Sequence, residues 1–549
     1  MNTRTQLSLR LIPMLAALLL AMVLGCTPTA QPPAKEAPAS GEKPAVEKPK
    51  EPKRGGVLSL VQTLGDPPSL DTHQESTGAT TQAVHPSYDN LVRFDFNQPD
   101  KIVPDLAEKW EVSPDGKAYT FHLVKGVKFH KGQPFTSADV KFTVERVMNP
   151  PKGMVSPRRD QFKAVTSIET PDENTVVFNT NRPNPSLLAA LAQGVLPIYS
   201  KQWIEANNND IPKKEVNGTG PFIFKEYIRG NSVESVKNPD YWVKGLPYLD
   251  GIKQYLITDP NTALAAFRTG QVMLFSVPAA SLDQLKQEMA EKVDFYPSEG
   301  EGFTALIPNH KRKPWDEPKV RQALNLAMDR NAAIQVLQQG SGVPGAYLKT
   351  SGFWGLPTEE LAKLPGYGKD KAKDLEDGKK LLTEVGLKTP IDIVLLTRKL
   401  QSYENIAVLY ADQLKKVGIN ATIRARETAE AYDVIRNGDY DLIAWSFGYS
   451  LEDPDAVYGE FVLCGAVRNW GNACTPEVDK LFDQQSQELD TGKRQQMVKE
   501  MEKKALMANQ MIVSHRSVST AGLYKYVKGY TPHAATRNNQ RFSYVWLDK

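Results

Sequence analysis

The sequence predicts an α/β protein. Short segments in which apolar and polar residues alternate, as in half-buried strands, are interleaved with amphipathic helical segments. Hydrophobic residues make up 40% and charged residues 24% of the 549 residues, which is typical of a globular protein and excludes wholesale disorder or a polytopic membrane protein. No repeat of fixed period occurs, which disfavours a solenoid or a propeller.

The strand segments define the expected sheet. They are expected at residues 57–61, 119–123, 175–179, 232–237, 391–396, 420–424 and 442–447. A helix is expected at residues 137–148, where Thr136 or Ser137 would cap the first turn. A single longer helix is expected at residues 318–337, which carry an apolar residue every three or four positions.

Two helix-then-strand units follow one another between residues 377 and 424. The helices expected at 377–385 and 404–417 each end at a glycine, Gly386 and Gly418, a residue that favours helix C-termini. A strand segment follows each glycine. This order predicts one α/β lobe in this part of the chain.

The first 26 residues are typical of an export signal. Arg4 and Arg10 precede an uncharged apolar run at residues 11–24, which is shorter than a comfortable bilayer span. A single membrane anchor helix is the alternative. The ending Val-Leu-Gly-Cys26 resembles the lipobox of bacterial lipoproteins, which implies cleavage of a signal peptide at 1–25 and lipidation of Cys26. More than one acyl chain would give stable membrane anchoring.

Residues 26–54 predict an extended tether behind that cysteine. They are rich in Pro, Ala, Lys and Glu, with Val46 as the only large apolar residue, so they cannot bury enough surface to fold. The signal carries two arginines and the tether six basic and four acidic residues, which leaves 59 basic and 60 acidic residues in 55–549. Such a balance disfavours a nucleic-acid partner.

Seven motifs, in one order along the chain, carry a family resemblance. They are residues 102–110, 113–123, 126–146, 218–222, 238–242, 320–330 and 476–479. Together they resemble the extracytoplasmic solute-binding proteins of family 5, the oligopeptide, dipeptide and nickel binders of ABC importers. The segment GVKFHKGQPFTSADVKFTVER at 126–146 is the most specific of them. The same motifs also have local meanings: Pro114-Asp-Gly predicts a turn, and Gly126, Gly132 and Pro134 predict a hairpin.

The resemblance implies a fold like the type II periplasmic binding proteins, with two lobes, a hinge and an inserted third domain. The implied boundaries are 55–87, 199–298 and 511–549 for lobe I, 88–198 for the inserted domain, 299–510 for lobe II, and 297–303 and 509–513 for the hinge. It further implies a monomer that captures a solute between the lobes, closes, and delivers the solute to an ABC permease outside the cytoplasm. No cofactor is implied.

The resemblance also implies ligand contacts in two segments. Ser76, Thr77 and Gly78 occupy the loop that pairs with the ligand backbone in peptide binders; an ordinary surface loop is the alternative. Ser450 stands where peptide binders carry an aspartate for the free amino group, and a neutral hydroxyl cannot replace that charge. Asp453 is interpreted as a cap or turn residue.

Aromatic residues are further candidates for the cleft. Trp445, Phe447 and Tyr449 alternate, so they would project from one face of a strand; core packing is the alternative. Thr428 aligns with a cleft tryptophan of some peptide binders. The remaining candidates, near the hinge or beside glycines, are Phe303, Phe353 and Trp354. This set favours a moderately polar, uncharged or weakly charged solute over an obligatory cation. A peptide is the default, with opines, sugars, nickel chelates and other amides open.

Cys464 and Cys474 are ten residues apart. Because export leads to an oxidising compartment, a disulfide is expected, with two free thiols or a metal pair as alternatives. No histidine lies between the two and the spacing is not that of a zinc knuckle, so a metal ranks last and no metal site is expected.

The sequence contains none of the common catalytic motifs that would argue against a solute-binding protein. The seven histidines form no His-Glu-x-x-His, and the sequence lacks a Gly-x-Ser-x-Gly elbow and a Walker-type loop. We therefore expect a lipid-anchored binding protein and no enzyme. A secreted carboxylate-pair glycosidase, or a chaperone or signalling receptor with the same fold, is the alternative.

Overall fold

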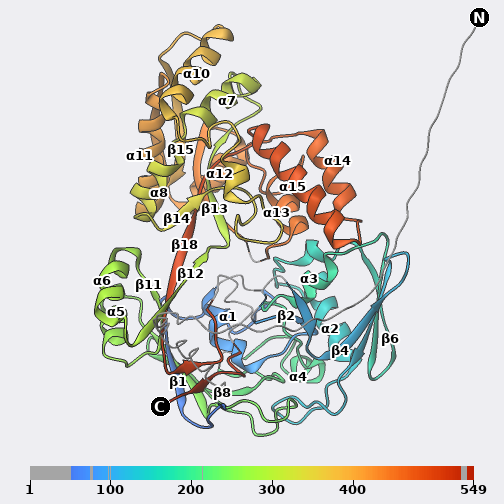
Figure 1. Ribbon diagram of the computed structural model, residues 1–549. Coiled ribbons are helices and arrows are strands. Elements are labelled where there is room, and N and C mark those ends of the chain that lie inside the picture. The colour runs from blue at the N-terminus through green and yellow to red at the C-terminus, as the bar shows by residue number, and fades with distance from the viewer. Residues whose placement is uncertain are drawn as a thin grey trace, which may run out of the picture. The chain divides into compact units, whose positions relative to one another are not determined.

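The computed structural model describes residues 51–549, except 75–77, 97, 99–100, 213, 450 and 533–540. The chain divides into two units, Met1–Glu51 and Pro52–Lys549, and all helices and strands below belong to the second (Figure 1). The signal segment, Cys26 and nearly all of the tether lie outside the described residues. Within the described part of the chain, no helix is long and apolar enough to cross a membrane.

One mixed sheet of 12 strands runs through both lobes. Its order is β16-β15-β17-β13-β18-β11-β1-β10-β9-β8, and β12 and β14 also pair with β18. We call the part built on β1 and β8–β12 lobe I, and the part built on β13–β17 lobe II. The bounds in lobe I are β1 Val57–Gln62, β8 Phe222–Ile228, β9 Ser232–Lys237, β10 Gly251–Leu256, β11 Leu274–Val277 and β12 Val293–Glu299. Those in lobe II are β13 Gly302–Pro308, β14 Gly342–Pro344, β15 Ile391–Arg398, β16 Ile419–Arg426 and β17 Leu442–Gly448.

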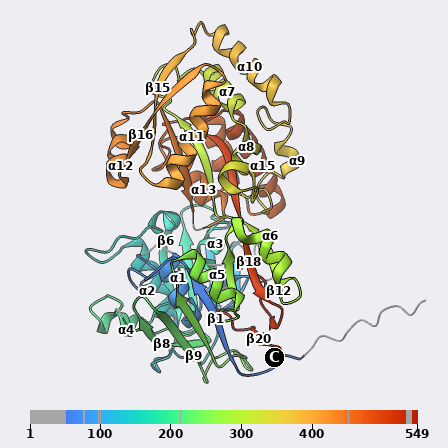
Figure 2. The same ribbon diagram turned by 90° about the vertical axis from the view of Figure 1, so that its left-hand side faces the viewer.

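Strand β18 (Ile512–Tyr524) belongs to both lobes (Figures 1 and 2). Its first residues pair with β13, where Leu306 lies opposite Ile512, and its last with β11, where Leu274 lies opposite Leu523. Pairing changes from β13 to β12 between residues 515 and 518, so the chain crosses a few residues later than the expected 509–513. The reason is that the strand continues unbroken past Val513.

The inserted domain is a separate antiparallel sheet of order β4-β5-β7-β6, with the short pair β2–β3 beside it. Its strands are β2 Val92–Phe94, β3 Ile102–Pro104, β4 Ala107–Val112, β5 Ala118–Leu123, β6 Val165–Asp172 and β7 Thr175–Thr180. The predicted turn and hairpin are confirmed: Gly116 N–H donates to the Ser113 carbonyl at 2.8 Å, and Lys128 bridges Pro134. A short pair, β19 (Val527–Lys528) and β20 (Trp546–Leu547), closes the chain.

Helices cover the sheets, and each region has its own apolar core. In lobe I and the inserted domain they are α1 Gly78–Val84, η1 His85–Ser87, α2 Ser137–Met148, η2 Arg159–Phe162, α3 Leu187–Ala192, α4 Lys201–Ala206, α5 Pro260–Arg268 and α6 Ala279–Met289. In lobe II they are α7 Pro318–Ala327, α8 Arg330–Gln338, α9 Thr358–Leu361, α10 Lys371–Glu384, α11 Gln401–Lys415, α12 Thr428–Asn437, α13 Pro454–Phe461, α14 Pro476–Gln485 and α15 Thr491–Met507.

The expectation of one helix at 318–337 is wrong. The structure has two, α7 and α8, and the break falls at Met328 and Asp329. The Asp329 carboxylate accepts from the Ala332 N–H at 2.9 Å and so starts the second helix as its N-cap. Apolar spacing continues through the break, which is why periodicity alone missed it. The predicted glycine stops are confirmed: Gly386 and Gly418 have φ of +76° and +88°.

Candidate functional site

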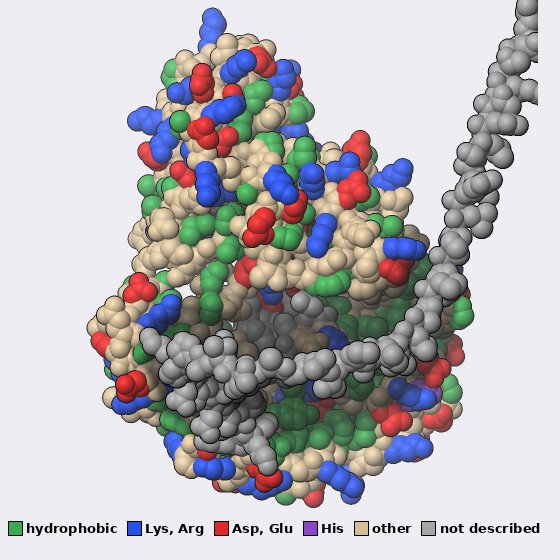
Figure 3. All heavy atoms as spheres, in the orientation of Figure 1, with side chains coloured by type: hydrophobic (Ala, Val, Ile, Leu, Met, Phe, Trp, Pro, Cys, Tyr) green, Lys and Arg blue, Asp and Glu red, His purple; other side chains and the backbone are tan. Residues whose placement is uncertain are grey.

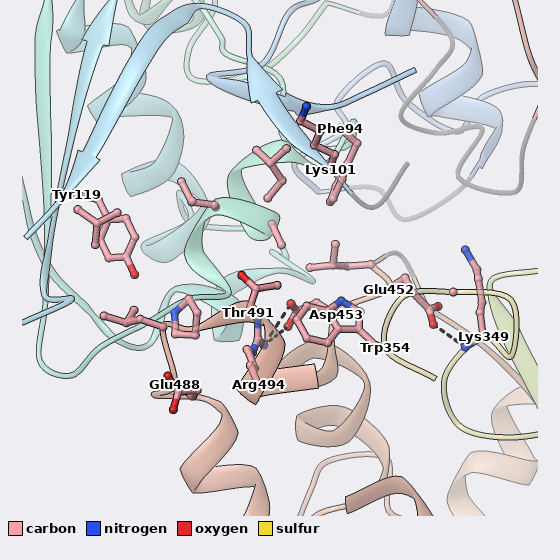
Figure 4. Close-up of a pocket in the computed structure, with 18 of the residues that line it drawn as sticks. Phe94, Lys101, Tyr119, Lys349, Trp354, Glu452, Asp453, Glu488, Thr491 and Arg494 are labelled. Atoms are coloured by element: carbon pink, nitrogen blue, oxygen red, sulfur yellow. Dashed lines mark hydrogen bonds and ion pairs between the residues drawn. The ribbon is translucent and has the colours of Figure 1, made fainter. Parts of the chain in front are cut away.

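A cavity of about 710 Å³ lies between the inserted domain and lobe II, with the connection between β12 and β13 at one side. A volume of this size suits a small-molecule ligand. The lining residues are Phe94, Lys101, Ile102, Trp110, Val112, Ser113, Pro114, Tyr119, Pro185, Leu188, Ala189, Ser298, Glu299, Glu301, Lys349, Ser351, Gly352, Trp354, Leu451, Glu452, Asp453, Glu488, Leu489, Thr491 and Arg494. Figure 4 shows Arg494, Asp453 and Trp354 at one wall and Tyr119 and Phe94 across the cavity.

The wall from the inserted domain is mainly apolar. Trp110 and Val112 come from β4, Tyr119 from β5 and Leu188 from α3. The Tyr119 hydroxyl donates to the Asn184 carbonyl at 2.7 Å, so the polar end of this side chain is already satisfied. Burial raises the pKa of Tyr119 to about 12, which keeps the phenol neutral at ordinary pH. This wall therefore offers aromatic and aliphatic surface.

The wall beside the hinge is built on a buried arginine. Arg516 of β18 is 0% exposed; its Nε lies 2.6 Å from Glu299 Oε1, and Nη2 donates to the Tyr449 hydroxyl at 2.5 Å. Burial opposes the charge of Arg516, but Tyr449, Glu452 and Glu299 together raise its pKa above the usual value. The Tyr449 hydroxyl in turn donates to Glu452. We call Arg516, Glu299, Glu452 and Tyr449 the hinge cluster.

Three carboxylates hold the loop that carries Trp354. Glu502 accepts from the backbone N–H of Leu348 at 2.8 Å and of Leu356 at 3.0 Å. Glu452 accepts from the next residue, Lys349, at 2.6 Å, and Glu299 accepts from the N–H groups of residues 350 and 351. Burial raises the pKa of Glu502 to about 8, although its two backbone hydrogen bonds lower it in part. The loop is thereby fixed beside the cavity.

A second buried arginine lies in helix α15 of lobe II. Arg494 of α15 is 4% exposed, and its Nη2 lies 3.4 Å from Asp453 and 3.3 Å from Asp455. The guanidinium also lies over the Trp354 ring, 4.6 Å from its centroid, in a cation–π contact. Burial and the neighbouring Asp453 raise the pKa of Asp455 to about 6, against the pull of Arg494. We call Arg494, Asp453 and Asp455 the rim cluster.

Asp453 is a helix cap, as the sequence analysis interpreted it. It is the N-cap residue of α13, and its carboxylate accepts from the Asp455 N–H at 2.9 Å. The same oxygen accepts from the Ser186 hydroxyl of the inserted domain at 2.8 Å. The cap thus also contacts a different domain.

Of the aromatic candidates, Trp354 lines the cavity, and Phe353 packs edge-on against it with ring centroids 4.9 Å apart. Phe303, Trp445 and Phe447 lie instead in the core of lobe II and are not among the lining residues. The reason is that β13 and β17 pair Phe303 with Phe447, so both rings lie on the same covered face of the sheet. Here the alternative of core packing holds.

Thr428 and Gly78, two other expected ligand residues, lie away from the cavity lining. Thr428 begins α12, where its hydroxyl accepts from Arg398 Nη2 at 2.9 Å, and it does not line the cavity. Gly78 begins α1, and a Cβ there would come within 2.7 Å of the Leu64 side chain. Ser76, Thr77 and Ser450 lie outside the described residues.

The structure joins Cys464 and Cys474 in a disulfide between α13 and α14. Away from it, the part of the chain that the structure describes contains no group of three His, Cys, Asp or Glu side chains placed to hold a metal ion. On the face shown in Figure 3, acidic and basic side chains are intermixed, without a large patch of one sign.

The fold and this cavity define a solute-binding protein of the two-lobed, type II periplasmic class. The chain belongs to the bacterial extracellular solute-binding proteins, family 5, whose model matches residues 101–469. Members of this family are extracytoplasmic substrate-binding proteins of ABC importers, and the chain is accordingly a binding protein rather than an enzyme.

Its relatives differ in what their names say they bind. The chain is 30% identical to di/tripeptide-binding protein 1 of Pseudomonas aeruginosa, over 79% of this chain and 84% of that protein. It is also 30% identical to heme-binding protein A of Haemophilus influenzae, over 85% and 88%. Among solved structures, DppA of Helicobacter pylori in complex with the peptide STSA matches with a TM-score of 0.72 and 25% identity, over 90% of this chain and 99% of that one.

The sequence analysis missed the charged residues of the cavity. One signal was available: Arg516 interrupts an otherwise mostly apolar and small-residue strand beside the expected hinge. Ser186, Glu299 and Arg494 gave no such signal, because each meets a partner more than 200 positions away in the chain.

Proposed function

We propose that this protein captures a peptide or other small polar solute in the cavity between the inserted domain and lobe II and delivers it to an ABC permease. The observation that supports this most is the cavity itself, which adjoins the two chain crossings at Gly300–Glu301 and residues 515–518. Bending there would open the cavity by moving lobe II relative to the rest, and closure would bury the solute.

The lining suits a zwitterionic solute with an apolar part. Carboxylates and cations both face the cavity from lobe II and the hinge, whereas the inserted domain offers mainly aromatic and aliphatic surface, with Lys101 as its cation. The proposed solute is thus more charged than the sequence analysis favoured. With Ser450 in place of an aspartate, a solute amino group would have to find another carboxylate, and Glu452 is two positions further along the chain.

The experiment is native mass spectrometry of protein purified without refolding, followed by thermal-shift measurements with a defined library of di- and tripeptides. We expect one bound solute per chain and an increase in Tm that grows with peptide concentration, with no turnover. Product formation, or no Tm shift with any peptide and no co-purified solute, would contradict the proposal.

We further propose that Cys26 is lipidated after removal of residues 1–25, so that the tether holds the folded part at a membrane. Cys26→Ala should move the protein from the membrane fraction to the soluble extracytoplasmic fraction. A control variant in the tether, Ser40→Ala, should stay with the membrane. Unchanged fractionation of Cys26→Ala would refute the anchor.

A further inference from the structure

Ser186 uses its side chain unusually. It is the N-cap residue of α3, yet its hydroxyl makes no hydrogen bond to its own helix, although serine at this position commonly caps the first turn. Instead the hydroxyl donates to Asp453 Oδ1 at 2.8 Å and accepts from Arg494 Nη2 at 2.8 Å. These partners are 267 and 308 positions away and belong to lobe II. The side chain therefore joins two domains.

Lobe II holds its side of this contact in place by itself. Arg494 Nε donates to Gln485 Oε1 at 3.0 Å, and Gln485 Nε2 donates to Asp455 at 2.6 Å. Asp453 is fixed by its cap bond to the Asp455 N–H. Both partners of Ser186 are thus oriented before the domains meet, which lowers the entropy cost of the contact.

A second contact lies beside the first. Gly116, in the turn between β4 and β5, has φ +68°, and Leu489 of lobe II lies against it. A Cβ on Gly116 would come within 2.8 Å of Leu489 Cδ1, closer than real contacts allow. The inserted domain therefore meets lobe II at two adjacent points, one polar and one apolar, at the rim of the cavity.

We propose that Ser186 is a positioning residue of the solute site, which holds the inserted domain against lobe II and slows release of the solute. This inference rests on the proposed function. Arg494 lies over Trp354 at the cavity wall, so the hydrogen bond from Arg494 to Ser186 links that wall to the inserted domain. Opening must break both hydrogen bonds of Ser186 to charged groups. Without Ser186, the Asp453 oxygen that accepts from the Asp455 N–H at the start of α13 loses its other partner, the Ser186 hydroxyl.

The first arm of the test is hydrogen–deuterium exchange on the full chain without added solute. In Ser186→Ala we expect the α13 amides at residues 455–457 to exchange about five- to tenfold faster than in the wild type. Ser186→Thr, which keeps the hydroxyl, should restore protection. Ser137→Ala is the matched control: it removes a buried hydroxyl hydrogen bond, to the Asp172 carbonyl at 2.6 Å, within the inserted domain alone. It should leave 455–457 unchanged.

The second arm measures release of a peptide from the library. The peptide should dissociate about five- to tenfold faster from Ser186→Ala than from the wild type, with little change in its association rate. If exchange at 455–457 is the same in Ser186→Ala and wild type, the contact is refuted, even where peptides bind normally. If exchange changes but release does not, Ser186 has no role in retention. If the wild type binds no peptide, the role in retention fails together with the proposed function, while the exchange result still decides the contact.

Discussion

The hinge cluster and the rim cluster are built from the same types of residue, but their geometry differs. In each, one buried arginine serves two carboxylates: Arg516 lies 2.6 Å from Glu299 and 4.0 Å from Glu452, and Arg494 lies 3.4 Å from Asp453 and 3.3 Å from Asp455. The hinge cluster has the shorter ion pair and lies where the two lobes join covalently. The rim cluster has longer pairs and completes its contacts with a hydroxyl from another domain. We infer that the hinge cluster stays paired when the lobes move, whereas the contact between the rim cluster and Ser186 can open.

The largest loss of stability is expected from a substitution in the hinge cluster. Arg516→Met leaves Glu299 and Glu452 buried without their main cation, so we expect a loss of about 3–5 kcal/mol in the free energy of unfolding, measured by urea denaturation. The control is Arg229→Met, because the Arg229 side chain is 89% exposed; it should change stability by less than about 0.5 kcal/mol. Equal stability of both variants would show that the hinge cluster is not a structural joint.

A smaller effect is expected at the rim. Arg494→Met should cost about 2–3 kcal/mol at pH 7, because Asp453 and Asp455 lose their cation. The pKa of Asp455 is already raised to about 6, so at pH 5 this group takes up a proton in the folded state and the loss should be smaller. Adding Asp455→Asn to the variant should abolish the difference between pH 5 and pH 7. A loss independent of pH in Arg494→Met would contradict this account.

Glu502, in lobe II, should make the free energy of unfolding depend on pH. Its folded-state pKa, about 8, is raised above the ordinary 4.5, so between these values the folded state binds the extra proton and stability falls as pH rises. In Glu502→Gln this fall should be weaker, so the variant gains on the wild type by about 1–2 kcal/mol between about pH 6.5 and pH 8. Urea unfolding at four pH values measures it. Glu500→Gln, with a side chain 61% exposed, should follow the wild type.

The smallest loss of stability is expected for a polar contact outside both clusters, and it gives a reference value for them. Asp329→Ala removes the N-cap of α8 and should cost about 1 kcal/mol, whereas Asp329→Asn should cost less. A loss as large as that of Arg516→Met would mean that the hinge cluster is energetically unremarkable.

What could be predicted from the sequence follows from how local each signal is. The strands, the turn at Pro114, the glycine stops and the Asp453 cap depend on neighbouring residues, and the structure contains them. The family resemblance, carried by motifs of mainly structural role, gave the two-lobed fold. The cavity wall could not be predicted in this way, because Ser186 meets Arg494 across 308 positions. Trp445 and Phe447 lie in the core of lobe II, since alternation shows that two residues share a face but not whether that face is covered.

Strand β18 has a consequence for when the molecule can fold. It lies between β13 and β11 in the sheet, yet it is formed by residues 512–524 of a 549-residue chain. Until those residues have left the ribosome or the export channel, both lobes lack an interior strand. Folding of both lobes therefore waits for residues 512–524, and a protein truncated before residue 512 would lose both lobes rather than one.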